Sequence, residues 1–585
     1  MEVGAGAVIL QMTSVLLGFV VLALIFDLNG YQGFSNQEAM ESAHLARQLA
    51  GGKGYTTDSI RPLNLFLLRR ADPNHAPQVL RNPVPDLSNP PGFPFLLAGL
   101  MKVLPFHFAA DRNQPWFYQP ELLIAAFNEL LFFGAVLLLF QVARRLFDSS
   151  VAWLSAVIFA GTELFWRFSV SGLSTIWLLV IFLALVWSLL ELEERERRPA
   201  PPGLGGSLAL AAAAGALAGL GGLSRYSFAW MIVPVLLFLS LFFTRARGRL
   251  CLWAAVAFLT VMTPWTARNF SLSQTCFGTA GYAVFQGTPP LPDDHLERSL
   301  NPNAAVGSVT PRDVVNKFFA NEREIVVNDL PRLGGSWVSA FFLCGLLLPF
   351  RSPALRRFRF FLIWSLLLLA AVQALGRTHL SADSPEINSE NLLVLLAPLV
   401  TIFGTGVFFT LLDQIALPDP KARRGVVGLF AAVMCGPLLL TLAGPPGASA
   451  PSRNSPFHVQ KTAAMLNPDE LMMSDIPWAV AWYGQRPCVW LTLDDAETFD
   501  QLNKIKPVQA IYLTQQTSDR RFLSQMLANQ HTWEYFMLNT LPDWAHGEVP
   551  TGFGSRFGLT NAPLDYAPSQ MFISDRNRWQ AAPKR

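Results

Sequence analysis

The sequence predicts a polytopic α-helical membrane protein with about eleven transmembrane helices and a small external α/β domain at its C-terminus. Of its 585 residues, 51% are hydrophobic and 15% are charged, whereas a soluble domain carries roughly 25% charged residues. Apolar runs recur up to about residue 443, and the remaining tail has a mixed helix and strand pattern. This composition excludes a soluble enzyme, and the net charge of +3 is too weak for a nucleic-acid-binding surface.

A transmembrane helix needs roughly 20 mostly apolar residues. The runs that qualify lie near 7–26, 122–143, 150–168, 173–190, 206–224, 228–244, 250–266, 335–350, 357–375, 390–412 and 425–443. They define a transmembrane domain over 1–443, which includes two long external loops at 27–120 and 267–334.

Basic residues in short loops predict the orientation of these spans. Short loops on one side hold 15 Lys and Arg residues, and those on the other side hold three, namely Arg167, Arg225 and Arg377. The N-terminus is therefore expected in the cytoplasm and the C-terminus outside. An apolar stretch at 90–105 is too short and too rich in proline to span, so we expect a helix at the outer interface.

The tail from 444 to 585 is expected to form an extracytoplasmic α/β domain. Short apolar runs at 470–474, 488–491 and 508–513 predict strands, and the stretches 495–504 and 521–530 predict helices.

Two carboxylates follow the first span. Helical periodicity over 36–49 ends at glycines 51 and 52, which is a helix-stop signal. Glu38 and Glu41 lie three residues apart, so they share one face of this helix. Neighbouring carboxylates raise each other's pKa, which would leave one of them as a general base at neutral pH. A solvated acidic face is the alternative, and spacing alone does not decide between the two.

The segment around these acids resembles the first external loop of the GT-C superfamily of polyprenyl-phosphate-sugar-dependent membrane glycosyltransferases. Its relatives include protein O-mannosyltransferases, lipid A aminoarabinose transferases and lipopolysaccharide galacturonosyltransferases. The stretches Ala46-Arg47-Gln48-Leu49 and Gly52-Lys53-Gly54-Tyr55 match the family pattern. In the ungapped register Glu38 takes the place of the family's catalytic Asp, and in the other register Gln37 does. Glu41 and Asp27 are the next acidic candidates.

Three further segments resemble the family. Asn89 opens a Pro-Pro-Gly stretch where relatives carry Lys or His, Arg225 ends a glycine-rich stretch, and Arg268-Asn269 closes a Pro-Trp-Thr-Ala-Arg-Asn loop. The resemblance implies a donor-binding role for all four residues and, more weakly, for Arg61. A guanidinium pairs with phosphate in bidentate fashion, while snorkelling at the membrane interface is the alternative for Arg225 and Arg268.

One feature of many relatives is missing, because the predicted external loop 168–175 contains no acidic residue. Glu129 lies in a flanking span, and an intramembrane acid is costly enough to indicate a role. An interhelical hydrogen bond or an ion pair with Arg225 is its structural alternative.

The resemblance implies an inverting glycosyltransferase in the bacterial inner membrane. It would move a sugar from a polyprenyl-phosphate donor to an extracytoplasmic hydroxyl, with Glu38 or Glu41 as general base. The alternatives are an inactive relative that binds a glycan or lipid and, less favoured, a transporter of lipid-linked sugars. The sequence indicates no certain cofactor. A divalent metal ion is compatible with the acids, although no ligand cluster argues for one.

Overall fold

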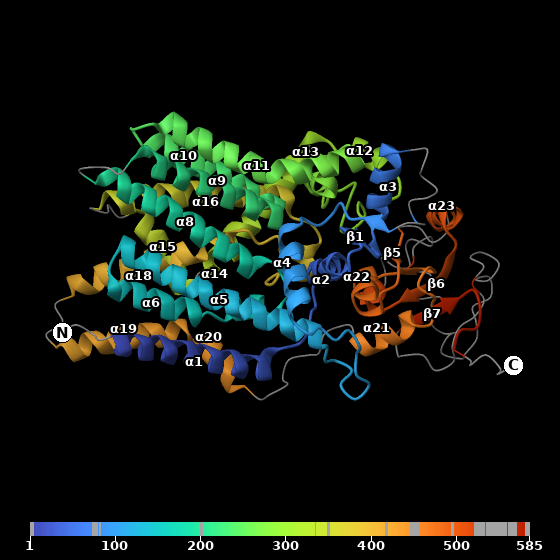
Figure 1. The fold of residues 1–585 in the computed structure, drawn as a ribbon, viewed down its shortest axis with the longest axis horizontal. Coiled ribbons are helices and arrows are strands. Elements are labelled where there is room, and N and C mark those ends of the chain that lie inside the picture. The colour runs from blue at the N-terminus through green and yellow to red at the C-terminus, as the bar shows by residue number, and fades with distance from the viewer. Residues whose placement is uncertain are drawn as a thin grey trace. The chain divides into compact units, whose positions relative to one another are not determined.

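The computed structural model describes residues 5–72, 83–198, 203–333, 335–347, 352–415, 419–444, 455–492, 497–519 and 570–579, and the single positions 80, 533 and 559. The chain divides into two compact units (Figure 1). The first, called the helical unit, comprises Met1–Asn36, Glu121–Pro264 and Asn316–Ser452. The second, called the mixed unit, comprises Gln37–Pro120, Trp265–Val315 and Arg453–Arg585.

Long apolar helices that lie side by side form the helical unit (Figure 1). Its helices are α1 Ala5–Gly30, α5 Gln119–Leu146, α6 Ser149–Ala160, α7 Glu163–Val170, α8 Thr175–Arg197, α9 Leu204–Ser224, η2 Tyr226–Met231, α10 Ile232–Phe242, α11 Arg247–Ser273, η4 Ile325–Asp329, α14 Leu330–Arg332, α15 Ser336–Leu347, α16 Pro353–Gly376, α17 Leu380–Asp383, η5 Leu393–Leu396, α18 Ala397–Gln414, α19 Pro420–Met434 and α20 Gly436–Ala443. The C-terminal part of α11, from Trp265 onward, belongs to the mixed unit.

Among the described residues, seven helices are long and apolar enough to cross a membrane, or nine if two bent helix pairs each count as one span. The bent pairs are α6 with α7, at 53°, and α19 with α20, at 60°. These nine candidates cover nine of the eleven runs expected from the sequence. The other two runs form shorter helices, η2 with α10 over Tyr226–Phe242 and α15 with 12 residues. The protein is a multi-pass membrane protein with seven to nine candidate spans.

Small residues allow close helix packing in this unit, as is typical of membrane helices. Helix α9 packs against α8. Gly215 of α9 faces α11 so closely that an added Cβ would lie 1.9 Å from the Ala254 carbonyl oxygen. The Gly- and Ala-rich sequence of α9 is therefore a packing requirement.

Short helices and a five-stranded sheet form the mixed unit. Its elements are α2 Gln37–Ala50, β1 Thr56–Thr57, β2 Ser59–Ile60, α3 Pro62–Ala71, β3 Val84–Pro85, α4 Gly92–Val103, η3 Gly278–Val284, α12 Asn303–Ser308, α21 Pro456–Ala463, β4 Leu471–Ser474, α22 Pro477–Ala479, η6 Val480–Gly484, β5 Cys488–Trp490, α23 Glu497–Ile505, β6 Val508–Leu513, α24 Gln515–Asp519 and β7 Met571–Ser574. Helix α13, Pro311–Glu324, begins in the mixed unit and ends in the helical unit.

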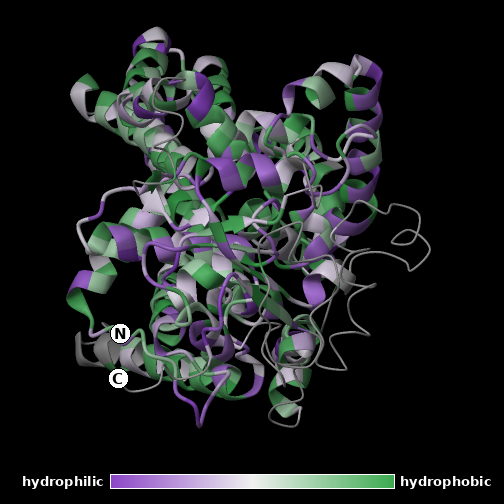
Figure 2. Cartoon of the chain, turned by 90° about the vertical axis from the view of Figure 1, so that its right-hand side faces the viewer, coloured by the Kyte–Doolittle hydropathy of each residue, from purple (hydrophilic) through white to green (hydrophobic). Residues whose placement is uncertain are grey.

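The five-stranded sheet has the order β2-β5-β4-β6-β7, and only β7 is antiparallel to its neighbour. Buried apolar residues fill its strands, which are mainly green in Figure 2. The strands at 471–474, 488–490 and 508–513 and the helix at 497–505 confirm the mixed pattern expected for the tail. The helix expected at 521–530 lies outside the described residues.

Strand β2 comes from the first long loop, yet it pairs in parallel with β5 from the C-terminal tail. The loop and the tail thus share one sheet. The division into domains 1–443 and 444–585 remains a prediction. The sequence did not predict the pairing of β2 with β5, because no local pattern signals a contact across more than 400 residues.

Two helices expected in the first loop are present. Helix α2 ends at Ala50, immediately before Gly51 and Gly52, and α4 occupies Gly92–Val103 with its exposed Phe95 and Val103.

Candidate functional site

Helix α2 of the mixed unit carries both candidate bases. Alanines 39, 43 and 46 and Leu45 are buried, so much of this short helix is enclosed by packing. Glu41 is only 2% exposed, whereas Glu38, one turn earlier, is half-buried. The two acids therefore occupy different environments on the same helix.

The carboxylate of Glu41 is held by three donors. Arg61 donates Nη2–H to Oε2 at 2.6 Å, Asn89 donates Nδ2–H to the same oxygen at 3.1 Å, and Ser59 donates its hydroxyl to Oε1 at 3.3 Å. The structure thus brings together three of the residues predicted from the sequence, Glu41, Arg61 and Asn89, from positions up to 48 residues apart.

Arg61 also pairs with a second carboxylate, since its Nη1 lies 3.2 Å from Oε2 of Glu297. Burial alone would lower the pKa of Arg61, but Glu297 and Glu41 raise it above its ordinary value. Arg61 is therefore a permanent cation whose charge is compensated by two acids.

A tight turn presents Asn89 to Glu41. Asp86 accepts hydrogen bonds from the backbone N–H groups of Ser88 and Asn89 on Oδ1, at 3.1 and 2.7 Å, and from the Asn89 amide on Oδ2 at 3.3 Å. An Asp that caps its own following backbone is a common turn device. Burial raises the pKa of Asp86 to about 6, with a further contribution from Glu41.

Arg268 holds the same turn from the other side. Its Nη1 donates to the backbone carbonyl of Asp86 at 2.8 Å and to Oδ1 of Asn269 at 2.9 Å, and its Nη2 donates to the carbonyl of Tyr55 at 3.2 Å. The guanidinium lies 4.5 Å from the ring centroid of Trp265. These hydrogen bonds join Arg268 to oxygen atoms without formal charge, and they orient the guanidinium.

Gly278 fixes the position of this turn. Its φ is +58°, and an added Cβ would lie 1.9 Å from the carbonyl oxygen of Leu87. The neighbouring Thr279 N–H donates to that carbonyl at 3.2 Å. Only glycine satisfies both the positive φ and the close approach.

A second polar cluster on α2 is structural. His44 is fully buried, and its Nε2 accepts the Asp58 backbone N–H at 3.0 Å. Burial holds the pKa of His44 well below its ordinary value, so the ring is neutral. Arg47, on the next turn, donates to the carbonyls of Ala481 and Trp482, both at 2.7 Å. This cluster joins α2 to η6.

Two predicted residues lie in the helical unit. Arg225 is buried at the end of α9 and donates Nη2–H to the Thr175 hydroxyl at 3.2 Å. The side chain of Glu129 forms a hydrogen bond with Asp27. The interhelical hydrogen bond that was one alternative for Glu129 is therefore present, and it joins α5 to α1.

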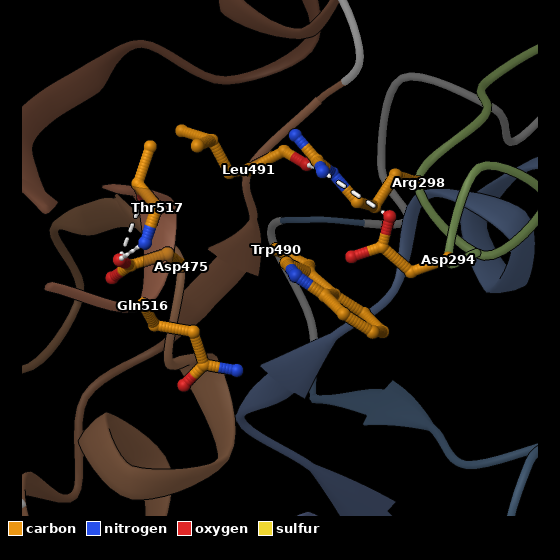
Figure 3. A pocket seen from close by; sticks show the side chains of 7 residues that line it. All are labelled: Asp294, Arg298, Asp475, Trp490, Leu491, Gln516 and Thr517. Carbon is orange, nitrogen blue, oxygen red and sulfur yellow. Dashed lines mark hydrogen bonds and ion pairs between the residues drawn. The ribbon is translucent and has the colours of Figure 1, made fainter. Parts of the chain in front are cut away.

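A small pocket lies at the carboxyl ends of β4 and β5 (Figure 3). Asp475 accepts two N–H and two O–H bonds from Thr514 and Thr517, while Arg298 donates to the carbonyls of Leu491 and Thr492 and pairs with Asp294. The cavity holds about 20 Å³, which is room for about one water molecule. The polar groups that line this cavity thus bind mainly one another. The bonds of Arg298 to Leu491 and Thr492 fix the segment that carries Glu297.

Within the described ranges, no group of three or more His, Cys, Asp or Glu side chains is placed to hold a metal ion.

Sequence reasoning missed Asp86, Glu297 and Ser59. An Asp three residues before Asn89 is a turn signal that could have identified Asp86. Glu297 and Ser59 carry no comparable local signal, because Glu297 reaches Arg61 from 236 positions further along the chain and Ser59 is one of many loop serines.

No protein-family model and no curated protein matches this chain in sequence. Solved structures do match. ArnT from Cupriavidus metallidurans, in a crystal structure with undecaprenyl phosphate, aligns over 98% of this chain and 100% of its own, with a TM-score of 0.54 and 12% identity. The chain has the GT-C fold.

The apo Archaeoglobus fulgidus oligosaccharyltransferase is a second match to the GT-C fold. It aligns over 86% of this chain and 69% of its own, with a TM-score of 0.50 and 12% identity. The GT-C-like fold class expected from the short motifs is thus confirmed over nearly the whole chain.

Proposed function

We propose that this GT-C protein is a membrane glycosyltransferase that uses a polyprenyl-phosphate sugar as donor. The observation that carries the proposal is the buried cluster of Glu41, Arg61 and Asn89 in the mixed unit, whose turn Arg268 holds, with Glu38 one turn before Glu41 on α2. The lipid carrier follows from ArnT, whose structure contains undecaprenyl phosphate. The sugar and the acceptor are left open, whether the acceptor is a lipid, a glycan or a protein.

The reaction needs one positioned base. The proton of the acceptor hydroxyl moves to a carboxylate, the acceptor oxygen bonds to the anomeric carbon, and the bond from that carbon to the phosphate oxygen breaks. The electron pair of that bond goes to polyprenyl phosphate, and the anomeric configuration inverts. A phosphate leaving group is already anionic, so a general acid is not essential.

Glu38 is the better base of the two acids. Both oxygens of Glu41 accept hydrogen bonds, and one of them pairs with Arg61 at 2.6 Å. We therefore assign Glu41 to positioning Arg61 and Asn89. Glu38 is half-buried, and it matches the family's catalytic Asp in the ungapped register.

Arg268 is the first candidate for the donor phosphate and Arg225 the second. Arg268 is oriented by backbone and amide oxygen atoms, and it lies in the Pro-Trp-Thr-Ala-Arg-Asn segment that resembles the family's loop. The charge of Arg61 is compensated by Glu41 and Glu297, so this residue organises the site. Asn89 and Asn269 then serve as neighbouring polar contacts.

The 15:3 distribution of basic residues supports a cytoplasmic N-terminus. We propose that the mixed unit acts outside the cytoplasm at a bacterial inner membrane, where the C-terminal sheet helps to bind the acceptor.

Purified protein in lipid nanodiscs, incubated with a panel of polyprenyl-phosphate sugars, tests the proposal through release of polyprenyl phosphate. Glu38→Gln is expected to lower kcat by about 10² to 10⁴-fold without lowering the unfolding temperature. Glu41→Gln is expected to lower both. Glu324→Gln, at an exposed acid on α13, is the matched control and should match the wild type.

An unchanged kcat in Glu38→Gln would refute this residue as the base. Undecaprenyl phosphate binding without turnover of any donor would instead favour an inactive binding protein. The observation favouring that second candidate is the absence of an Asp at both 37 and 38.

A further inference from the structure

Helix α13 and the π-helical turn η4 expose apolar side chains along one face. Val315, Phe319, Val326 and Val327 are 50%, 65%, 52% and 60% exposed. These positions recur at the spacing of one helical face. An aqueous surface helix shows the opposite arrangement, because its apolar face is normally buried.

The opposite face of this segment is polar and makes specific contacts. Lys317 is buried, and burial lowers its pKa to about 8. The electrostatic interaction with Glu390 has a smaller, opposite effect and raises that pKa. Asn321 donates to the carbonyl of Ala374 at 2.8 Å. Gln373 donates to Asp329 of η4 at 3.0 Å. The exposed face is thus fixed by the polar contacts behind it.

These contacts define the depth of the segment. Ala374 and Gln373 lie within the last turn of α16, a candidate span that ends at Gly376. Glu390 lies in the loop after α16, where it accepts hydrogen bonds from Thr378 and Ser381. The segment therefore lies at the level of the C-terminal end of this candidate span.

The lipid-facing surface of α16 supports the same location. Leu367 and Trp364 on this span are 58% and 45% exposed, as is expected of side chains that contact acyl chains. Asn321 of α13 and Asp329 of η4 contact the last turn of this span, so the exposed face lies near the end of a lipid-facing helix.

We propose that α13 and η4 form an interfacial anchor whose exposed face inserts into the boundary between lipid headgroups and acyl chains. Arg312 and Arg323 are exposed on the same face, on either side of Phe319. Their guanidinium groups are placed to contact lipid phosphates while the valines and Phe319 enter the acyl region. The occupant of this face is lipid, and this inference does not depend on the proposed enzymatic activity.

Bimane fluorescence in nanodiscs of phosphatidylcholine and phosphatidylglycerol tests this inference. The full-length protein carries Cys276→Ser and Cys344→Ser, which remove the exposed cysteines, and a label at Phe319→Cys. Leu367→Cys on α16 is the acyl-chain control, and Lys504→Cys on α23 is the aqueous control. Lipids brominated near the headgroup or deep in the acyl chain serve as quenchers.

Headgroup-proximal bromine should quench the label at position 319 about threefold more than the label at position 504. The label at 367, about 14 Å along the helix from the end of α16, should respond more to deep bromine. Equal quenching at 319 and 504 would overturn the inference. Crosslinking of two copies through position 319 without lipid quenching would also overturn it, because the face would then be a protein interface.

Discussion

Two arginines of the mixed unit, both predicted to contact the donor phosphate, lie in different environments. Arg61 is bonded to the carboxylates of Glu41 and Glu297, at 2.6 and 3.2 Å. Arg268 is bonded to the carbonyls of Asp86 and Tyr55 and to the Asn269 amide oxygen. The same residue type thus pairs with two acids in the first region and holds a turn through neutral oxygen atoms in the second. The bonded partners, more than the residue type, decide which role an arginine has.

Removing Arg61 should give the largest loss of stability. Arg61→Met removes the cation that pairs with the buried Glu41 and the half-buried Glu297, and breaking a buried pair in this way costs about 3–5 kcal/mol. Thermal unfolding in detergent measures the loss. Arg423→Met, which removes an exposed pair with Asp413, should cost less than about 1 kcal/mol. Equal losses would show that Arg61 is no more important to the fold than a surface arginine.

The turn that joins the two regions should make stability depend on pH. Burial raises the pKa of Asp86 from 3.8 to about 6, so the folded protein holds this proton more tightly than the unfolded chain. The stabilisation is complete below pH 3.8 and is lost as pH rises through 6. It amounts to roughly 3 kcal/mol.

Unfolding midpoints between pH 4 and 7 measure this dependence. Asp86→Asn should remove that part of the slope. Ser88→Ala should retain it, because the Ser88 hydroxyl has no hydrogen-bond partner in the described part of the chain. A slope that persists in Asp86→Asn would assign the titration to another group.

Arg268 should affect binding more than stability. Arg268→Gln is expected to weaken undecaprenyl phosphate binding by about 10- to 100-fold, since hydrogen bonds to charged groups contribute roughly 1.5–3 kcal/mol. Arg268→Lys should recover part of the affinity, because it restores the charge without the bidentate geometry. Native mass spectrometry gives the affinities. Arg249→Gln, at the other end of α11, is the control, and an equal loss there would indicate general electrostatics.

The smallest effect is expected at Tyr55, beneath Arg268. Its hydroxyl lies 3.0 and 3.1 Å from the carbonyls of Asn89 and Pro90. Tyr55→Phe keeps the ring against Trp265 and should lower the free energy of unfolding, measured by thermal unfolding in detergent, by about 1 kcal/mol. A loss of stability larger than that of Arg61→Met would show that the region around Arg268 matters more to the fold than the region around Arg61.

Much of the fold follows from local sequence patterns. Nine of the eleven expected spans coincide with long or bent helices, because a run of about 20 apolar residues satisfies the membrane by itself. Helix α2 ends at its glycines as expected, since helix stops are local signals. Part of the site could be predicted as well, because Glu41, Arg61 and Asn89 lie in recognisable segments of the first loop.

The sequence by itself determined the membrane class, the positions of most helices and the segments that carry the candidate residues. Only the tertiary structure decided which of those residues touch. It placed Glu297 on Arg61 and paired β2 with β5 across more than 400 residues. Apolar runs and helix stops depend on neighbouring residues, whereas charge pairing depends on contacts between distant segments, which no local pattern encodes.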